Sequence, residues 1–143
     1  MEELLLNFSG EPKAIQSVRF AKIGAHFSKY QPKQNVEWKN FIKITAIGQL
    51  PPDWVLLDAP VGITVEFRFT PPKSMRKRDI LAIQSGNVVY KTTKPDLTDN
   101  LCKGLIDALT GVVWRDDSLI CRVASVKRYA MTPGVAMKII RLD

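Results

Sequence analysis

Aspartate residues gather in one short stretch of a chain that is otherwise rich in lysine and arginine. Five of the fourteen acidic residues lie in this stretch, and each is an aspartate: Asp96, Asp99, Asp107, Asp116 and Asp117. Aspartate has a short side chain that suits fixed oxygen ligation of a hard cation such as Mg²⁺, whereas glutamate is the better helix former for a solvated surface. The cluster therefore indicates a site for a divalent metal, without indicating a substrate.

A helix is expected to carry the first part of this cluster. Apolar residues recur at helical spacing over residues 97–110, and Gly111 follows where a left-handed backbone commonly ends a helix. At about 100° per residue, one side of this helix carries a polar set: Asp99, Asn100, Lys103 and Asp107. The ammonium group of Lys103 on that side is placed to hold a phosphate or to stabilise the charge that develops during hydrolysis.

Ordinary structural roles are also open to these residues. Asp99 or Thr98 near the helix start can interact with free backbone N–H groups, and Lys103 can form an ion pair with Asp99 or Asp107. Asp116 fits a solvated turn. A strand running back along the helix would instead return an acid to the N-terminal end of the helix, where a divalent cation would relieve the repulsion between carboxylates.

The remaining periodicity places this helix in a mixed structure. Alternating apolar residues predict strands, most clearly at 61–69 and also at 4–8, 88–92, 118–129 and 135–142, with a hairpin or loop pair at 18–28. Helical spacing predicts a helix over 35–50, and Ser74 is a candidate cap for another that runs through Gln84. We expect a single α/β or α+β domain over residues 1–143, with a mixed β-sheet and about three helices packed on it. Trp38 and Trp114 are expected in its core.

The net charge of +7 favours a polyanionic partner such as nucleic acid. The candidate DNA contacts are Arg19, Lys73, Arg76, Lys77, Arg78, Lys91, Lys94, Lys127 and Arg128. The two cysteines lack C-x-x-C spacing and His26 is the single histidine, so zinc and iron–sulfur sites lack ligands. The N-terminus has no leader pattern and no apolar run approaches the length of a membrane span, so a cytoplasmic protein without a membrane partner is expected.

The acidic stretch contains three connected motifs: Lys94-Pro95-Asp96-Leu97-Thr98-Asp99-Asn100-Leu101-Cys102-Lys103, then Asp107-Ala108-Leu109, then Gly111 followed by Trp114-Arg115-Asp116-Asp117-Ser118. Together they resemble the signature of the RusA family of Holliday junction resolvases. Weaker similarity extends to Gly10-Glu11-Pro12 and to the basic segment around Arg19, so the resemblance covers most of the chain.

This resemblance implies a homodimeric crossover junction endodeoxyribonuclease that binds four-way DNA junctions and cuts two opposed strands with Mg²⁺. Carried over to this sequence, the metal ligands and catalytic acids are Asp96, Asp99 and Asp117, and Lys103 is the catalytic cation. The first two aspartates stand one residue farther apart than the family's Asp-x-Asp, so Asp116 or Asp107 is an alternative ligand to Asp96. Ser17-Val18-Arg19 also stands where Arg-Pro-Arg is common in the family.

Two other functions remain as alternatives. A non-catalytic basic nucleic-acid-binding protein would use the aspartates only to cap and solvate a helix. A nuclease of the Pro-Asp…Asp/Glu-x-Lys class is suggested by Pro95-Asp96, but that motif places its later acid and lysine together on a strand. Asp99 and Lys103 lie on a predicted helix instead, which disfavours this class.

Overall fold

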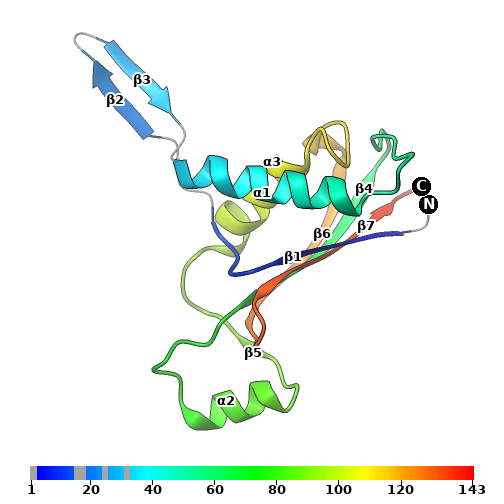
Figure 1. Ribbon diagram of the computed structural model, residues 1–143. Helices are drawn as coiled ribbons and strands as arrows, with labels where there is room; N and C mark the ends of the chain where they lie inside the picture. Colours follow the sequence, from blue (N-terminus) through cyan, green and yellow to red (C-terminus); the bar gives the residue numbers. More distant parts are fainter. Residues whose placement is uncertain (1–2, 15–18, 24–25, 31–32) are drawn as a thin grey trace.

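A mixed five-stranded sheet forms the centre of the molecule (Figure 1). The computed structural model describes residues 3–14, 19–23, 26–30 and 33–143, and it describes side chains in the first and last of these ranges. The strand order is β1-β7-β4-β6-β5, in which β4 and β6 are parallel and the other neighbours are antiparallel. The strands are β1 (Glu3–Ser9), β4 (Val61–Phe69), β5 (Val89–Tyr90), β6 (Ile120–Tyr129) and β7 (Gly134–Arg141).

Helices α1 and α3 pack on one face of this sheet, α2 lies apart near β5, and a separate hairpin extends beyond the start of α1 (Figure 1). The helices are α1 (Lys33–Gln49), α2 (Lys77–Gln84), the π-helical turn η1 (Leu97–Cys102), α3 (Lys103–Leu109) and the 3₁₀ turn η2 (Asp117–Leu119). The hairpin pairs β2 (Arg19–Ile23) with β3 (His26–Tyr30). Within the described ranges, no helix combines the length and apolar character needed to cross a membrane.

The core lies between the sheet and the pair α1 and α3. Strand β4 alternates as its sequence predicts, since Val61, Ile63, Val65, Phe67 and Phe69 are all buried. From the helices, α1 and α3 contribute large apolar side chains to the same cluster. The prediction that both tryptophans are core residues is confirmed, because Trp38 is 6% exposed and Trp114 is fully buried.

The predicted fold class is confirmed, since a mixed sheet is combined with three α-helices in an α+β fold, and two of these helices, α1 and α3, pack on the sheet. The predicted start of α2 is wrong. Ser74 does not cap this helix, which begins at Lys77 after Arg76, and Arg76 itself makes no side-chain capping hydrogen bond. The helix predicted over 97–110 is divided into a π-turn and a short α-helix, and Gly111 has the expected positive φ of 85°.

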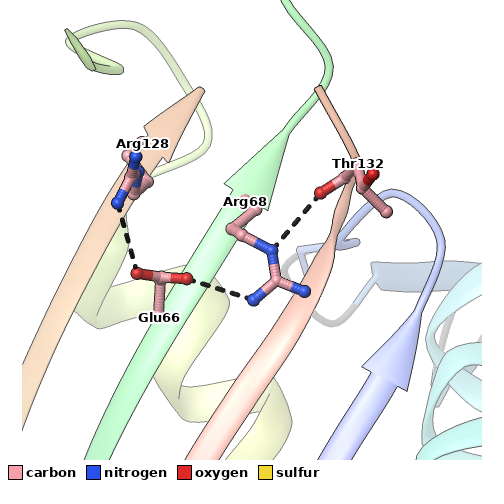
Figure 2. A network of polar contacts seen from close by, with 4 residues as sticks. All are labelled: Glu66, Arg68, Arg128 and Thr132. Atoms are coloured by element: carbon pink, nitrogen blue, oxygen red, sulfur yellow. Dashed lines mark hydrogen bonds and ion pairs between the residues drawn. The ribbon is translucent and has the colours of Figure 1, made fainter. Parts of the chain in front are cut away.

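An ion-pair network lies on the sheet face opposite α1 and α3 (Figure 2). Glu66 Oε1 is 3.1 Å from Arg68 Nη1, and Glu66 Oε2 is 3.6 Å from Arg128 Nη1. The Arg68 Nε–H donates to the Thr132 carbonyl oxygen at 3.3 Å. The three charged side chains are between 19% and 33% exposed, so their charges are less screened than those of a fully exposed pair. The network thus ties together β4, β6 and the turn before β7.

Replacing Glu66 by alanine is expected to lower the free energy of unfolding by about 1–2 kcal/mol, because two guanidinium groups lose their carboxylate. Urea denaturation followed by circular dichroism measures this loss. Glu37→Ala is the matched control, since Glu37 and Lys33 lie 3.7 Å apart with side chains 62% and 89% exposed. The control should lose less than about 0.5 kcal/mol. Equal losses in the two variants would contradict the stabilising role of Glu66.

Candidate functional site

Strand β6 runs back along η1 and α3, and its course determines where Asp116 and Asp117, which precede it, lie. The end of β6 reaches the start of η1, where Lys127 contacts Pro95, and the start of β6 lies near the end of α3. Asp117, in the turn that leads into β6, is close enough to Asp107 for the two charges to interact. The returning acid therefore lies close to Asp107, and the pocket that Asp117 lines also reaches Thr98 in the first turn of η1.

An open pocket of about 450 Å³ lies between this helical segment and β6. Its polar lining is Thr98, Lys103, Asp107 and Asp117. Its apolar lining is Cys102, Ile106, Ile120 and Val123. The Lys103 side chain and two carboxylates thus line one cavity, an arrangement suited to a charged ligand such as a phosphodiester.

Asp116 and Asp117 behave as one acidic pair. A hydrogen bond from protonated Asp117 to the Asp116 carboxylate lowers the pKa of Asp116, and hydrogen bonds from Ser118 lower it further. The same carboxyl–carboxyl hydrogen bond raises the pKa of Asp117, as do desolvation and the charges of Asp116 and Asp107. Two carboxyl groups this close together repel each other when both are ionised, and a bound cation would relieve that repulsion.

Backbone hydrogen bonds hold the segment that carries this acidic pair. The Leu57 N–H donates to the Val113 carbonyl at 3.0 Å, and the Arg115 N–H donates to the Leu57 carbonyl at 2.9 Å. The Gly111 N–H donates to the Trp114 carbonyl at 2.8 Å, and Arg115 pairs with Asp58 at 3.2 Å. The turn before Asp116 is therefore fixed to the segment that precedes β4.

The first two aspartates lie at the start of η1. The Leu101 N–H donates to the Asp96 carbonyl at 3.1 Å, and this bond spans five residues, as in a π-turn. Asp96 is the residue that precedes the turn, and its side chain makes no capping hydrogen bond. Asp96 and Asp99 are both exposed and are not among the residues that line the pocket.

The structure therefore brings together only part of the predicted site. Lys103 and Asp117 share the pocket, whereas Asp96 and Asp99 are not among its lining residues, although Thr98 between them is. In the parts of the chain that the structure describes, no group of three or more histidine, cysteine or acidic residues is arranged to hold a metal ion by itself. The same parts contain no ion pair of Lys103, so its salt bridge to Asp99 or Asp107 does not form; Lys39 is 3.8 Å from Asp107 instead.

The predicted DNA contacts are distributed over four regions. Lys73, Arg76, Lys77 and Arg78 lie in or before α2, at the opposite end of the molecule from α1 (Figure 1), and all four are exposed. Lys91 and Lys94 belong to the loop that leads to η1, Lys127 contacts this loop, and Arg128 belongs to the Glu66 network. Arg19 is on β2, and its side chain lies outside the described residues.

Some residues of the pocket were not selected from the sequence. Cys102, Ile106, Ile120 and Val123 look like ordinary apolar residues, and only the pairing of β6 with β4 brings the last two beside η1. Burial raises the pKa of the Cys102 thiol, which a hydrogen bond with Ser125 of β6 partly offsets. A buried, protonated thiol is a poor nucleophile, so Cys102 contributes packing to the site.

Comparison with known proteins identifies the family. Residues 9–140 match the family model described as endodeoxyribonuclease RusA. The chain is also 28% identical over 132 residues to the uncharacterized protein YqaN of Bacillus subtilis (strain 168), covering 91% of this chain and 90% of that protein. Because the family model matches nearly the whole chain, the protein belongs to the RusA family of endodeoxyribonucleases, a class of DNA hydrolases.

Proposed function

We propose that this protein is a magnesium-dependent nuclease that resolves four-way DNA junctions, in DNA recombination and repair, by paired symmetrical nicks. The observation that carries the proposal is the pocket in which Lys103 faces Asp107 and Asp117, on a chain whose family is that of endodeoxyribonucleases. The chain's net charge of +7 supports a polyanionic substrate.

The metal-binding side chains near the pocket are of the chemical type that magnesium prefers. They are carboxylates, without histidine or thiolate competition, and hard cations prefer oxygen ligands. Magnesium is commonly held by one or two protein carboxylates together with water and substrate phosphate oxygens, so a closed set of three protein ligands is not required. The Asp116–Asp117 pair supports this assignment, because a bound cation would relieve the repulsion between two neighbouring carboxylates.

We propose Asp96, Asp99 and Asp117 as the ligands, with Asp116 and Asp107 as the neighbouring acids that could substitute. Relative to the family's Asp-x-Asp spacing, this chain has one extra residue between the first two aspartates. A π-turn takes up one residue more than an α-turn, and η1 occupies this position. The extra residue can therefore be accommodated locally, which is why Asp96 stays in the proposed set.

Lys103 is assigned to the phosphate. Its ammonium group lines the pocket and is not engaged in an ion pair with any described residue, so it can stabilise negative charge on a scissile phosphate. Bound magnesium would supply Lewis-acid stabilisation of the phosphate oxygens and a water of lowered pKa.

Two opposed cuts in one junction call for two active sites, and a two-fold homodimer supplies them. The exposed basic residues before and in α2, together with Lys94, are proposed contacts to the phosphate backbone. Such contacts give binding that weakens steeply with salt and that reads little base sequence.

The test compares an end-labelled four-way junction with a linear duplex of matched sequence, each incubated with Mg²⁺ or EDTA. We expect paired nicks only in the junction and only with Mg²⁺, and we expect Asp99→Asn to abolish them while circular dichroism and junction binding stay as in the wild type. Asp99 is exposed, so the substitution should not unfold the chain.

Other outcomes would assign other functions. Junction binding without cleavage under every metal condition would favour the non-catalytic binding protein, whose affinity should not fall when aspartates are neutralised. Nicks in the linear duplex at the same rate would leave a nuclease without junction selectivity. Normal cutting by Asp99→Asn would remove Asp99 from the ligand set.

A further inference from the structure

The loop of residues 91–96, which joins β5 to η1, is held by a lysine from a distant strand. Lys127 Nζ donates to the Thr93 carbonyl at 2.6 Å and to the Pro95 carbonyl at 2.7 Å. Lys127 lies opposite Phe67 in the register of β4 and β6, so its side chain leaves the sheet on the face that carries the core. Two of its three donors are thus committed to main-chain oxygens of this loop.

A second lysine fixes the other end of the same loop. The Lys91 N–H donates to the Lys127 carbonyl at 3.2 Å, and Lys91 Nζ donates to Thr93 Oγ1 at 2.8 Å. The Lys91 ammonium also lies 5.2 Å and 5.4 Å from the ring centres of Phe69 and Tyr129. Lys127 therefore contacts a loop that is already anchored at its start, and it sets where the loop ends.

The loop ends at Asp96, so these contacts fix the backbone on both sides of that residue. The Pro95 carbonyl belongs to the same planar peptide group as the Asp96 nitrogen, which means that holding this oxygen restricts the position of the Asp96 Cα. On the other side, the Asp96 carbonyl accepts the π-turn hydrogen bond from the Leu101 N–H. The Asp96 carboxylate itself makes no capping bond, so the contacts that hold this residue in place are those of its backbone.

We infer that Lys127 is a positioning residue for Asp96, acting through the Thr93 and Pro95 carbonyl oxygens. The inference rests on the proposed function, in which Asp96 is a metal ligand. It gives Lys127 a role different from the contact with DNA phosphate that its charge suggests. A partner that orients a metal ligand typically changes metal affinity by ten- to a hundredfold when it is removed, although it never touches the metal.

The test measures metal binding directly, with Mn²⁺ as the probe in isothermal titration calorimetry without DNA. We expect Lys127→Met to weaken Mn²⁺ binding by about tenfold or more. Lys138→Met is the matched control, because it removes the same charge from an exposed position of a strand in the same sheet, and its Mn²⁺ affinity should equal that of the wild type. In the cleavage assay, raising the Mg²⁺ concentration should restore the rate of Lys127→Met.

Three outcomes would overturn the inference. Unchanged Mn²⁺ affinity with weaker junction binding in EDTA would show that Lys127 contacts DNA. Unchanged Mn²⁺ affinity with only a lower melting temperature would show a purely structural role. If the wild-type protein binds no Mn²⁺ and cuts no DNA, the proposed function is wrong, and the inference that rests on it is wrong as well. This result is seen in the wild-type protein, so it is distinguished from a failure of the Lys127 inference, which is seen only in the variant.

A second variant guards against misfolding. If Lys127→Met does not fold, Lys127→Gln retains an N–H donor but has a side chain too short to serve both carbonyls as the lysine does. It should weaken Mn²⁺ binding in the same direction and by a smaller factor. Wild-type affinity in folded Lys127→Gln would contradict the inference.

Discussion

Replacing Asp117 by asparagine is expected to lower the rate of junction nicking by at least about a hundredfold. Asparagine has almost the same shape, but it lacks the charge needed to bind a hard cation. Asp117 shares the pocket with Lys103 and is exposed, so its loss should affect chemistry rather than folding. Single-turnover cleavage of a labelled junction measures the rate, and urea denaturation should show a change below about 0.5 kcal/mol.

The controls for this experiment separate a local role from a general loss of negative charge. Asp53→Asn makes the same chemical change at an exposed turn after α1, and it should nick at the wild-type rate. Asp116→Asn tests the other member of the acidic pair. If Asp116→Asn is inactive and Asp117→Asn is active, the ligand is Asp116; if both variants cut normally, neither residue is part of the active site.

The secondary structure was largely predictable because its signals are local. The alternation of β4 and the helical spacing of α1 are properties of consecutive residues, and both elements lie where those patterns place them. Strand order was not predictable, because β4 lies between β6 and β7, and pairing of such distant segments is not encoded in either pattern. The boundary of α2 also escaped prediction, since its first turn has no capping side chain to mark it.

The detail of the candidate site depends on distances that no local pattern fixes. Helical geometry correctly placed Lys103 and Asp107 on one side of the segment. The π-turn was not predicted, because one wider turn leaves no recognisable periodicity in six residues. How far Asp117 returns along α3 depends on the turn that Leu57 holds, a contact between segments far apart in the chain.

The sequence contains one indication that Lys127 has an internal hydrogen-bond partner, which its positive charge alone would not suggest. In β6, Val123, Ser125, Lys127 and Tyr129 occupy alternate positions, which share a face. A lysine on the core-facing side of a strand needs hydrogen-bond partners, because burying an unpaired ammonium group is costly. The alternation therefore favours an internal partner for Lys127, and an exposed lysine such as Lys94 carries no such signal.

The largest loss of stability is expected at Trp114, which connects the core to the acidic pair. Its side chain is fully buried, and its Nε1–H donates to Thr110 Oγ1 at 3.0 Å. Trp114→Ala removes a large ring from a packed interior and leaves a cavity, so the free energy of unfolding should fall by about 3–5 kcal/mol.

Urea denaturation of Trp114→Ala beside Val55→Ala tests this expectation, because Val55 is 77% exposed and its truncation should cost less than about 0.5 kcal/mol. Trp114→Phe should lie between them, since it retains a ring and loses the hydrogen bond to Thr110. A loss below about 1 kcal/mol in Trp114→Ala would mean that the surrounding residues collapse into the space. The segment of Val113 and Arg115 would then be held by its hydrogen bonds to Leu57 alone, and the position of Asp116 and Asp117 would not depend on the core.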